Sequence, residues 1–208
     1  APLPVVARRR AAGGRGGPAA AVGGPGPVGG AVRMNAGGHG SDLAASLVRV
    51  RVVDLADGED GEVDTTDLHL AYRSSAVAST QVVVWAELEL APGSVAEAEA
   101  EIAEIVRWRR ANQPGGQNAG SVFTNPPGDS AGRLIDAAGA KGLRIGTAEV
   151  SPKHANFIQA DEGGSADDVW QLMGAVRQRV FDHAGVVLHP ETRIVGFGPL
   201  PELTGVGA

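Results

Sequence analysis

Apolar and polar positions alternate along two segments in the first half of the chain. Residues 47–55 and 80–90 are rich in β-branched side chains, and the second segment alternates clearly in its C-terminal half. This spacing is typical of β-strands with one buried face. We therefore expect two strands, with a hairpin or loop around Asp57 and Gly58 between them.

Helical spacing follows in the second half. Residues 94–110 begin at Ser94, are acidic in their first half and end on basic residues, which suits the helix macrodipole. Shorter elements are expected as a helix over 130–138 and strands over 155–160 and 186–188. The sequence predicts a long helix from 165 to about 183, with core positions at Val169, Leu172, Met173, Val176 and Val180.

The composition is that of a globular protein with one core or two small ones. Hydrophobic residues make up 43% and charged residues 20% of the 208 positions, and the net charge of −6 argues against a nucleic-acid-binding surface. The absence of cysteine excludes disulfides and thiolate metal sites, and the histidines show no metal-ligand spacing, so we assign no metal. No apolar run is long enough for a membrane span, which makes a cytoplasmic protein the simplest interpretation.

Glycine and proline are concentrated in residues 11–40. Such a run is typical either of a flexible linker or of a backbone that approaches another group closely, and both interpretations stay open for residues 11–22. From Val22 onward the glycine–proline order is too structured for a simple linker, and exposed amides in such turns can bind phosphate.

Ser121 and Glu191 are the candidate chemical groups of the C-terminal half. Ser121 follows a glycine turn and has no neighbouring histidine or lysine to make it a nucleophile, so its role would be to donate or relay a proton. The alternative is a turn hydroxyl that caps backbone amides. Glu191, within His-Pro-Glu-Thr-Arg, could hold the other proton or be a surface carboxylate.

Five ordered blocks of the C-terminal half resemble the UDP-N-acetylenolpyruvoylglucosamine reductase (MurB) family. The blocks are residues 119–126, 131–135, 142–146, 150–158 and 190–196. Upstream, residues 25–31 with 35–37 are similar to that family's second flavin-contacting loop, and residues 72–75 are similar to its active-site arginine segment. The resemblance covers roughly residues 22–197.

The resemblance implies an α+β fold in two parts. Residues 22–92 would form part of a flavin-binding domain of the vanillyl-alcohol-oxidase and MurB type, and residues 93–208 a C-terminal substrate-binding domain, after an irregular or altered segment 1–21. The family's glycine-serine-asparagine loop for the flavin pyrophosphate has no match here. We therefore expect a truncated or N-terminally altered member, monomeric if complete and prone to associate through exposed strand edges if truncated.

The implied reaction is the NADPH-dependent reduction of UDP-N-acetylglucosamine enolpyruvate through FAD, in peptidoglycan precursor synthesis. Hydride addition creates an enolate that must be stabilised by positive charge and protonated at carbon. By resemblance Ser121 donates this proton, and Arg73 and Glu191 stabilise the enolate. The resemblance assigns flavin contacts to Pro25, Gly26, Val28, Gly29, Gly30, Asn35, Ala36 and Gly37, and substrate contacts to Tyr72, Asn125, Lys153, His154 and Asn156.

Other interpretations stay open at this point. Arg73 could be a solvated strand-end residue, and His154 a hydrogen-bonded structural histidine. The chain as a whole could be a non-catalytic fragment that binds a UDP-sugar but holds flavin weakly or not at all. A flavin oxidase with another substrate is disfavoured, because the covalent flavin histidine of that superfamily has no evident counterpart.

Overall fold

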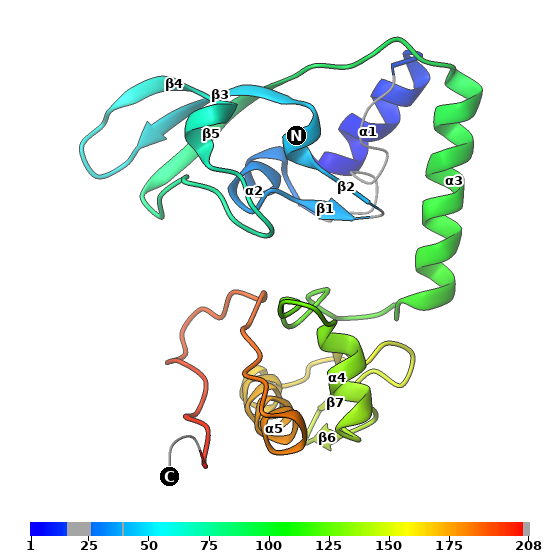
Figure 1. Ribbon diagram of the computed structural model, residues 1–208, viewed down its shortest axis with the longest axis vertical. Coiled ribbons are helices and arrows are strands. Elements are labelled where there is room, and N and C mark those ends of the chain that lie inside the picture. The colour runs from blue at the N-terminus through cyan, green and yellow to red at the C-terminus, as the bar shows by residue number, and fades with distance from the viewer. Residues whose placement is uncertain (16–25, 39, 206–208) are drawn as a thin grey trace. The chain divides into compact units, whose positions relative to one another are not determined.

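The computed structural model describes residues 1–15, 26–38 and 40–205. The fold is α+β, and the chain divides into two compact units, Ala1–Arg109 and Arg110–Ala208, with separate hydrophobic cores (Figure 1). The sequence places the second domain from residue 93. In the structure most of the long helix α3 (Val95–Asn112) belongs to the first unit, where its residue Ile105 packs with Ala7.

The first unit is built on a three-stranded antiparallel sheet in the order β4-β3-β5. Val50 and Val52 of the central strand are buried, whereas Arg49 and Arg51 form ion pairs with carboxylates of the two neighbouring strands. This alternation confirms both strands expected from the sequence pattern. The strands are β3 (Leu47–Asp54), β4 (Asp60–Asp64) and β5 (Gln81–Leu88).

Two elements of this unit differ from the sequence prediction. The turn expected at Gly58 is present, but its second arm is the acidic strand β4, which has no alternating apolar positions to reveal it. The sequence predicts an irregular segment over 1–21, but Leu3–Ala12 form helix α1, in which Leu3, Ala7 and Ala11 are buried at four-residue intervals. The remaining elements are α2 (Val28–Arg33), β1 (Gly37–Gly38), β2 (Ser41–Asp42) and the 3-10 helices Leu43–Ala45 and Thr65–Leu68.

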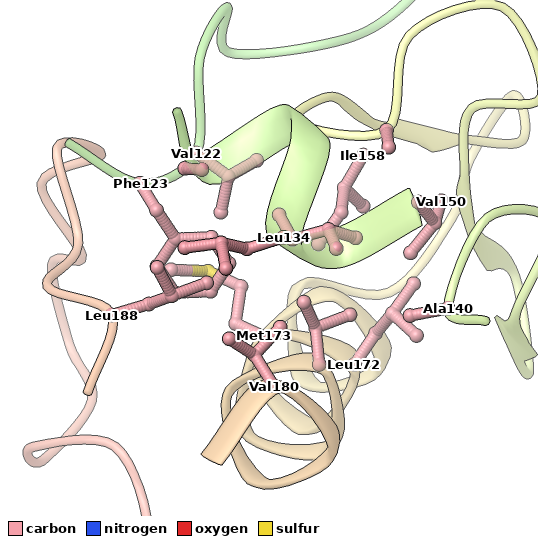
Figure 2. Close-up of a cluster of buried hydrophobic side chains, with 14 of the residues drawn as sticks. Val122, Phe123, Leu134, Ala140, Val150, Ile158, Leu172, Met173, Val180 and Leu188 are labelled. Carbon is pink, nitrogen blue, oxygen red and sulfur yellow. The ribbon is translucent and has the colours of Figure 1, made fainter. Parts of the chain in front are cut away.

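The second unit packs two helices against a small antiparallel sheet in the order β6-β7-β8. Its core is formed where Leu172, Met173 and Val180 of the long helix meet Leu134 and Val150 (Figure 2). All five of these side chains are nearly inaccessible to solvent. The elements are α4 (Ala131–Ala137), β6 (Arg144–Ile145), β7 (Ala148–Val150), β8 (Ile158–Ala160) and α5 (Ala166–Ala184).

Both helices of this unit begin at a serine N-cap. The hydroxyl of Ser130 accepts from the amide of Arg133 at 3.3 Å, and that of Ser165 accepts from Asp167 at 3.1 Å. Gly185 ends α5 in the left-handed conformation, as expected from the sequence. The strand expected over 186–188 is wrong: these residues form no ladder, and only an isolated bridge forms beyond them, at Pro190.

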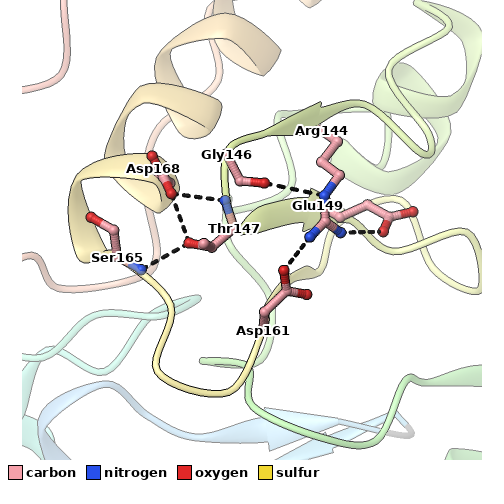
Figure 3. Close-up of polar contacts among 7 residues, drawn as sticks. All are labelled: Arg144, Gly146, Thr147, Glu149, Asp161, Ser165 and Asp168. Carbon is pink, nitrogen blue, oxygen red and sulfur yellow. Dashed lines mark hydrogen bonds and ion pairs between the residues drawn. The ribbon is translucent and has the colours of Figure 1, made fainter.

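A polar cluster joins the start of α5 to the β6–β7 hairpin (Figure 3). A carboxylate oxygen of Asp168 accepts from the amide of Thr147 at 2.8 Å and from its hydroxyl at 2.7 Å, and that hydroxyl accepts from the amide of Ser165 at 2.8 Å. These hydrogen bonds lower the pKa of Asp168. An added Cβ at Gly146, where φ is +51°, would lie 2.3 Å from the same carboxylate, so the close approach depends on glycine.

Candidate active site

Ser121 and Glu191 lie on two chain segments that pair through the backbone of Val122. The carbonyl of Val122 accepts from the amides of Glu191 at 2.8 Å and Thr192 at 3.3 Å. The hydroxyl of Thr192 donates to the carbonyl of Ser121 at 3.4 Å, across 71 residues of sequence. The structure therefore brings together the two segments that the sequence singles out separately.

Asn156 holds the opposite edge of the Ser121 segment. Its carbonyl accepts from the amide of Val122 at 2.9 Å. Its side-chain oxygen accepts from the amide of Phe123 at 3.0 Å, and its side-chain nitrogen donates to the carbonyl of Phe123 at 2.8 Å. Asn156 is 4% exposed and thus serves as a buried support for the backbone beside Ser121, a relationship that the spacing of the two motifs does not reveal.

The turn before Ser121 is closed by an asparagine. Gly120 has a φ of +80°, and its amide donates to the side-chain oxygen of Asn118 at 3.0 Å. Ser121 follows this turn with its side chain only partly buried. The backbone amide of this turn is thus capped by the side chain of Asn118 and not by the hydroxyl of Ser121.

The other residues assigned to substrate in this unit also make contacts within it. Asn125 accepts from the amide of Ala131 at 3.0 Å, at the start of α4, and the ammonium of Lys153 donates to the carbonyl of Arg110. His154 packs edge-to-face on Phe157 with ring centroids 4.8 Å apart. Asn125 and Lys153 keep exposed surface beside these contacts.

His154 is the histidine of this region with a perturbed pKa. Burial lowers that pKa, because the charged imidazolium loses hydration, and the nearby charge of Lys141 lowers it further. Nδ1 of His154 accepts from the amide of Asn156 at 3.2 Å, a bond that requires this nitrogen to be unprotonated. His154 therefore makes the contact expected of a hydrogen-bonded structural histidine.

In the first unit, the arginine segment is tied to the glycine loop. The guanidinium of Arg73 donates to the carbonyl of Gly37 at 3.2 Å and lies 5.2 Å from the ring centroid of Tyr72. The side chain of Asn35 donates to the carbonyl of Ala71 at 3.2 Å. Arg73 also has a φ of +54°, a left-handed conformation that is uncommon for a residue with a side chain. The sequence treats these two segments as separate motifs, and the structure joins them.

Two residues of the glycine loop, Gly37 and Asn35, are held by close contacts within the unit. An added Cβ at Gly37 would lie 2.6 Å from Cβ of Asp42, whereas one at Gly29 would make an ordinary van der Waals contact with the carbonyl of Val83, at 3.4 Å. The side-chain nitrogen of Asn35 donates to the carboxylate of Asp42 at 2.9 Å, and its side-chain oxygen accepts from the backbone amide of Ala44 at 3.0 Å. Of the other assigned residues, Gly26 has a φ of +110°, Val28 and Gly30 lie in α2, and Ala36 packs on the core.

Pro25 lies outside the described residues. In the part of the loop that is described, no buried side-chain polar atom lacks a partner. Contacts within the unit therefore account for Gly37 and Asn35, whereas an added Cβ at Gly26 would meet nothing within 4 Å.

The described residues contain no group of three or more histidine, aspartate or glutamate side chains that could hold a metal ion. Among the described helices, none combines the length and the apolar character needed to cross a membrane.

Comparisons with known proteins show which family the chain is similar to. Residues 112–195 match the family model for the C-terminal domain of UDP-N-acetylenolpyruvoylglucosamine reductase. The chain is 43% identical over 195 residues to the reductase of that name from Rubrobacter xylanophilus and 41% identical over 201 residues to that from Synechococcus, covering 93% and 94% of this chain. It spans 65% of the length of each of these relatives.

A solved structure is similar over nearly the whole chain. The crystal structure of UDP-N-acetylenolpyruvylglucosamine reductase (MurB) from Thermus caldophilus superposes with a TM-score of 0.82 at 36% identity, covering 92% of this chain and 69% of that one. An identity above 30% that extends over more than two thirds of a solved relative shows common descent as well as a common fold. The chain belongs to the UDP-N-acetylenolpyruvoylglucosamine reductase family.

Proposed function

We propose that this chain carries the proton-transfer groups of a cytoplasmic reductase that converts UDP-N-acetylglucosamine enolpyruvate to UDP-N-acetylmuramate. The observation that carries the proposal is the pairing of the Ser121 and Glu191 segments through Val122. The names of the relatives support the reaction class.

The chemistry assigns a separate task to each side chain. Hydride adds to one carbon of the enolpyruvyl double bond, and the electron pair moves onto the carbon beside the carboxylate to give an enolate. Ser121 gives its hydroxyl proton to that carbon and regains a proton from solvent. By resemblance, Arg73 and Glu191 stabilise the enolate, and a guanidinium such as that of Arg73 is suited to a two-point bond with a carboxylate.

Ser121 needs help to act as an acid, because an alcohol in water releases its proton reluctantly. Its partly buried position allows a bound substrate to exclude water from it, which is the condition under which such a transfer becomes efficient. Backbone bonds to Asn156 and Thr192 on its two sides fix the segment that carries the hydroxyl.

By resemblance, bound FAD reduced by NADPH would supply the hydride. No step of the proposal is routed through FAD itself. The proposal for this chain concerns the handling of substrate and proton.

The test is substrate-dependent NADPH oxidation by the purified chain after incubation with FAD. We expect oxidation to require both FAD and the enolpyruvyl substrate. If the chain retained FAD and oxidised NADPH at the same rate with and without the enolpyruvyl substrate, the proposal would be contradicted.

A second function is supported by the glycine loop. Since contacts within the first unit account for Gly37 and Asn35, the chain could bind the UDP-sugar without retaining flavin. Absorbance at about 450 nm after incubation with FAD and desalting separates the two functions, because oxidised flavin absorbs there and only bound FAD remains after desalting. A colourless protein that binds the UDP-sugar in calorimetry would favour the second.

A further inference from the structure

An apolar pocket lies in the second unit beside the Ser121 segment. Its floor is formed by Val122, Ile158 and Met173, which are 4%, 6% and 1% exposed. The three side chains come from the Ser121 segment, β8 and α5, and Figure 2 shows them in the same core. The exposed loop residues Asn118 and Ala119 form the rim. Every one of these elements belongs to the second unit, so the pocket does not depend on the first.

The side chains of Asn118 and Thr192 and the carbonyl of Gln117 form hydrogen bonds within the protein. The side chain of Asn118 bonds within its own turn, to Gly116 and Gly120. The hydroxyl of Thr192 donates to the carbonyl of Ser121, and the carbonyl of Gln117 accepts from the amide of Ala160. The surface that faces the pocket is therefore apolar, and no lining residue carries a charge.

The size of the pocket limits what it can hold. Its volume is about 180 Å³. A dry apolar cavity of about 150 Å³ is large enough to bind benzene, whereas pockets for drug-sized ligands are roughly 300–1,000 Å³. The pocket thus fits one aromatic ring and is too small for a nucleotide sugar or a flavin.

We propose that this pocket is a binding site for a small uncharged aromatic molecule of about the size of benzene. An anion or cation would lose its hydration without gaining a partner, because the walls offer neither charge nor a free polar group. An apolar ring loses no such bonds and removes apolar surface of Met173, Val122 and Ile158 from water. The ring would contact Val122, whose backbone holds both Asn156 and Glu191. The proposal is independent of the reductase activity.

The chain offers an internal control for a direct test. It contains two methionines, Met173 in the pocket floor and Met34 at the end of α2 in the first unit. With ¹³C-methyl methionine, benzene can be titrated while both methyl signals are followed by NMR, and a Met34→Leu variant assigns them. We expect a saturable shift of the Met173 signal and no comparable shift of the Met34 signal.

Filling the pocket should abolish the response. Ala160→Leu places a larger side chain in the space, and Ala119→Leu does so from the exposed rim if the first variant fails to fold. Ala137→Leu, at an exposed position of α4, is the matched control and should keep the wild-type shift. Three results would each overturn the proposal: no Met173 shift up to the solubility limit of benzene, parallel shifts of both methionines, or an unchanged Met173 shift in a folded, filled variant.

Discussion

The side-chain amide of Asn156 and the backbone of Phe123 exchange two hydrogen bonds, of 3.0 and 2.8 Å, as two residues of neighbouring strands would. Both residues are buried, so water cannot reach the N–H and the C=O of Phe123, and the side chain of Asn156 supplies their hydrogen-bond partners. The position of Ser121, two residues before, depends on this contact and on the pairing with the Glu191 segment.

Replacing Asn156 with alanine should therefore destabilise the second unit. Two buried backbone groups would lose their partners, and each unsatisfied group costs roughly 1–3 kcal/mol. Urea unfolding followed by the fluorescence of Trp170, with Trp85 and Trp108 replaced by phenylalanine, reports on this unit. Gln171→Ala, at an exposed position of α5, is the control. Equal unfolding free energies for the two variants would contradict this account.

Acid should weaken the link between α5 and the β6–β7 hairpin. Hydrogen bonds from Thr147 lower the pKa of Asp168 in the folded state below its ordinary value of 3.8. A lowered folded pKa stabilises the fold above the unfolded pKa, and this stabilisation is lost as pH falls through the folded pKa. Asp168→Asn should therefore lower the melting temperature near neutral pH, and its effect should shrink as pH falls through the folded pKa of Asp168.

The neighbouring carboxylate supplies the control for this prediction. Asp167 is exposed and contributes its amide to the Ser165 cap, so Asp167→Asn should change the melting temperature less than Asp168→Asn does. Both melting curves can be recorded by circular dichroism across the pH range. If the Asp168→Asn deficit were the same at acid and neutral pH, the carboxylate would not be its source.

The glycine loop should tolerate a methyl group at one of two adjacent positions. Gly37→Ala places its Cβ 2.6 Å from Cβ of Asp42 and 2.8 Å from the carbonyl of Ser41, whereas nothing lies within 4 Å of a Cβ at Gly38. Gly37→Ala should cost about 1–3 kcal/mol through overpacking, and Gly38→Ala should be close to neutral. Urea unfolding followed by Trp85 fluorescence measures both, and equal effects would contradict the packing argument.

Local signals explain how much of the fold was predictable. The core spacing of α5, its Ser165 cap and Gly185 specify that helix within about twenty residues, so the sequence predicts it closely. Strand β4 is specified by partners elsewhere, because its acidic residues pair with Arg49 and Arg51 of β3, and no local alternation marks it. The apolar run at 186–188 has the local pattern of a strand but no strand partner, and Leu188 is buried in the core without strand pairing.

The same division applies to the candidate site. The motifs around Ser121 and Glu191 can be recognised in the sequence, but their pairing spans 71 residues and appears only in the fold. The resemblance assigns Asn156 to substrate, and the structure shows that it holds the backbone of Phe123, 33 residues away. The sequence does not reveal which distant backbone groups a buried asparagine will form hydrogen bonds with.

The central claim is that Ser121 delivers a proton to carbon, and steady-state kinetics of Ser121→Ala test it most directly. Loss of a general acid typically costs about 10²–10⁴-fold in rate, so kcat should fall by that factor while KM changes little. Ser121→Cys, which keeps an acidic hydrogen, should retain more activity, and Ser79→Ala, at an exposed loop position, should match the wild type. A Ser121→Ala variant that is folded and turns over at the wild-type rate would contradict the account.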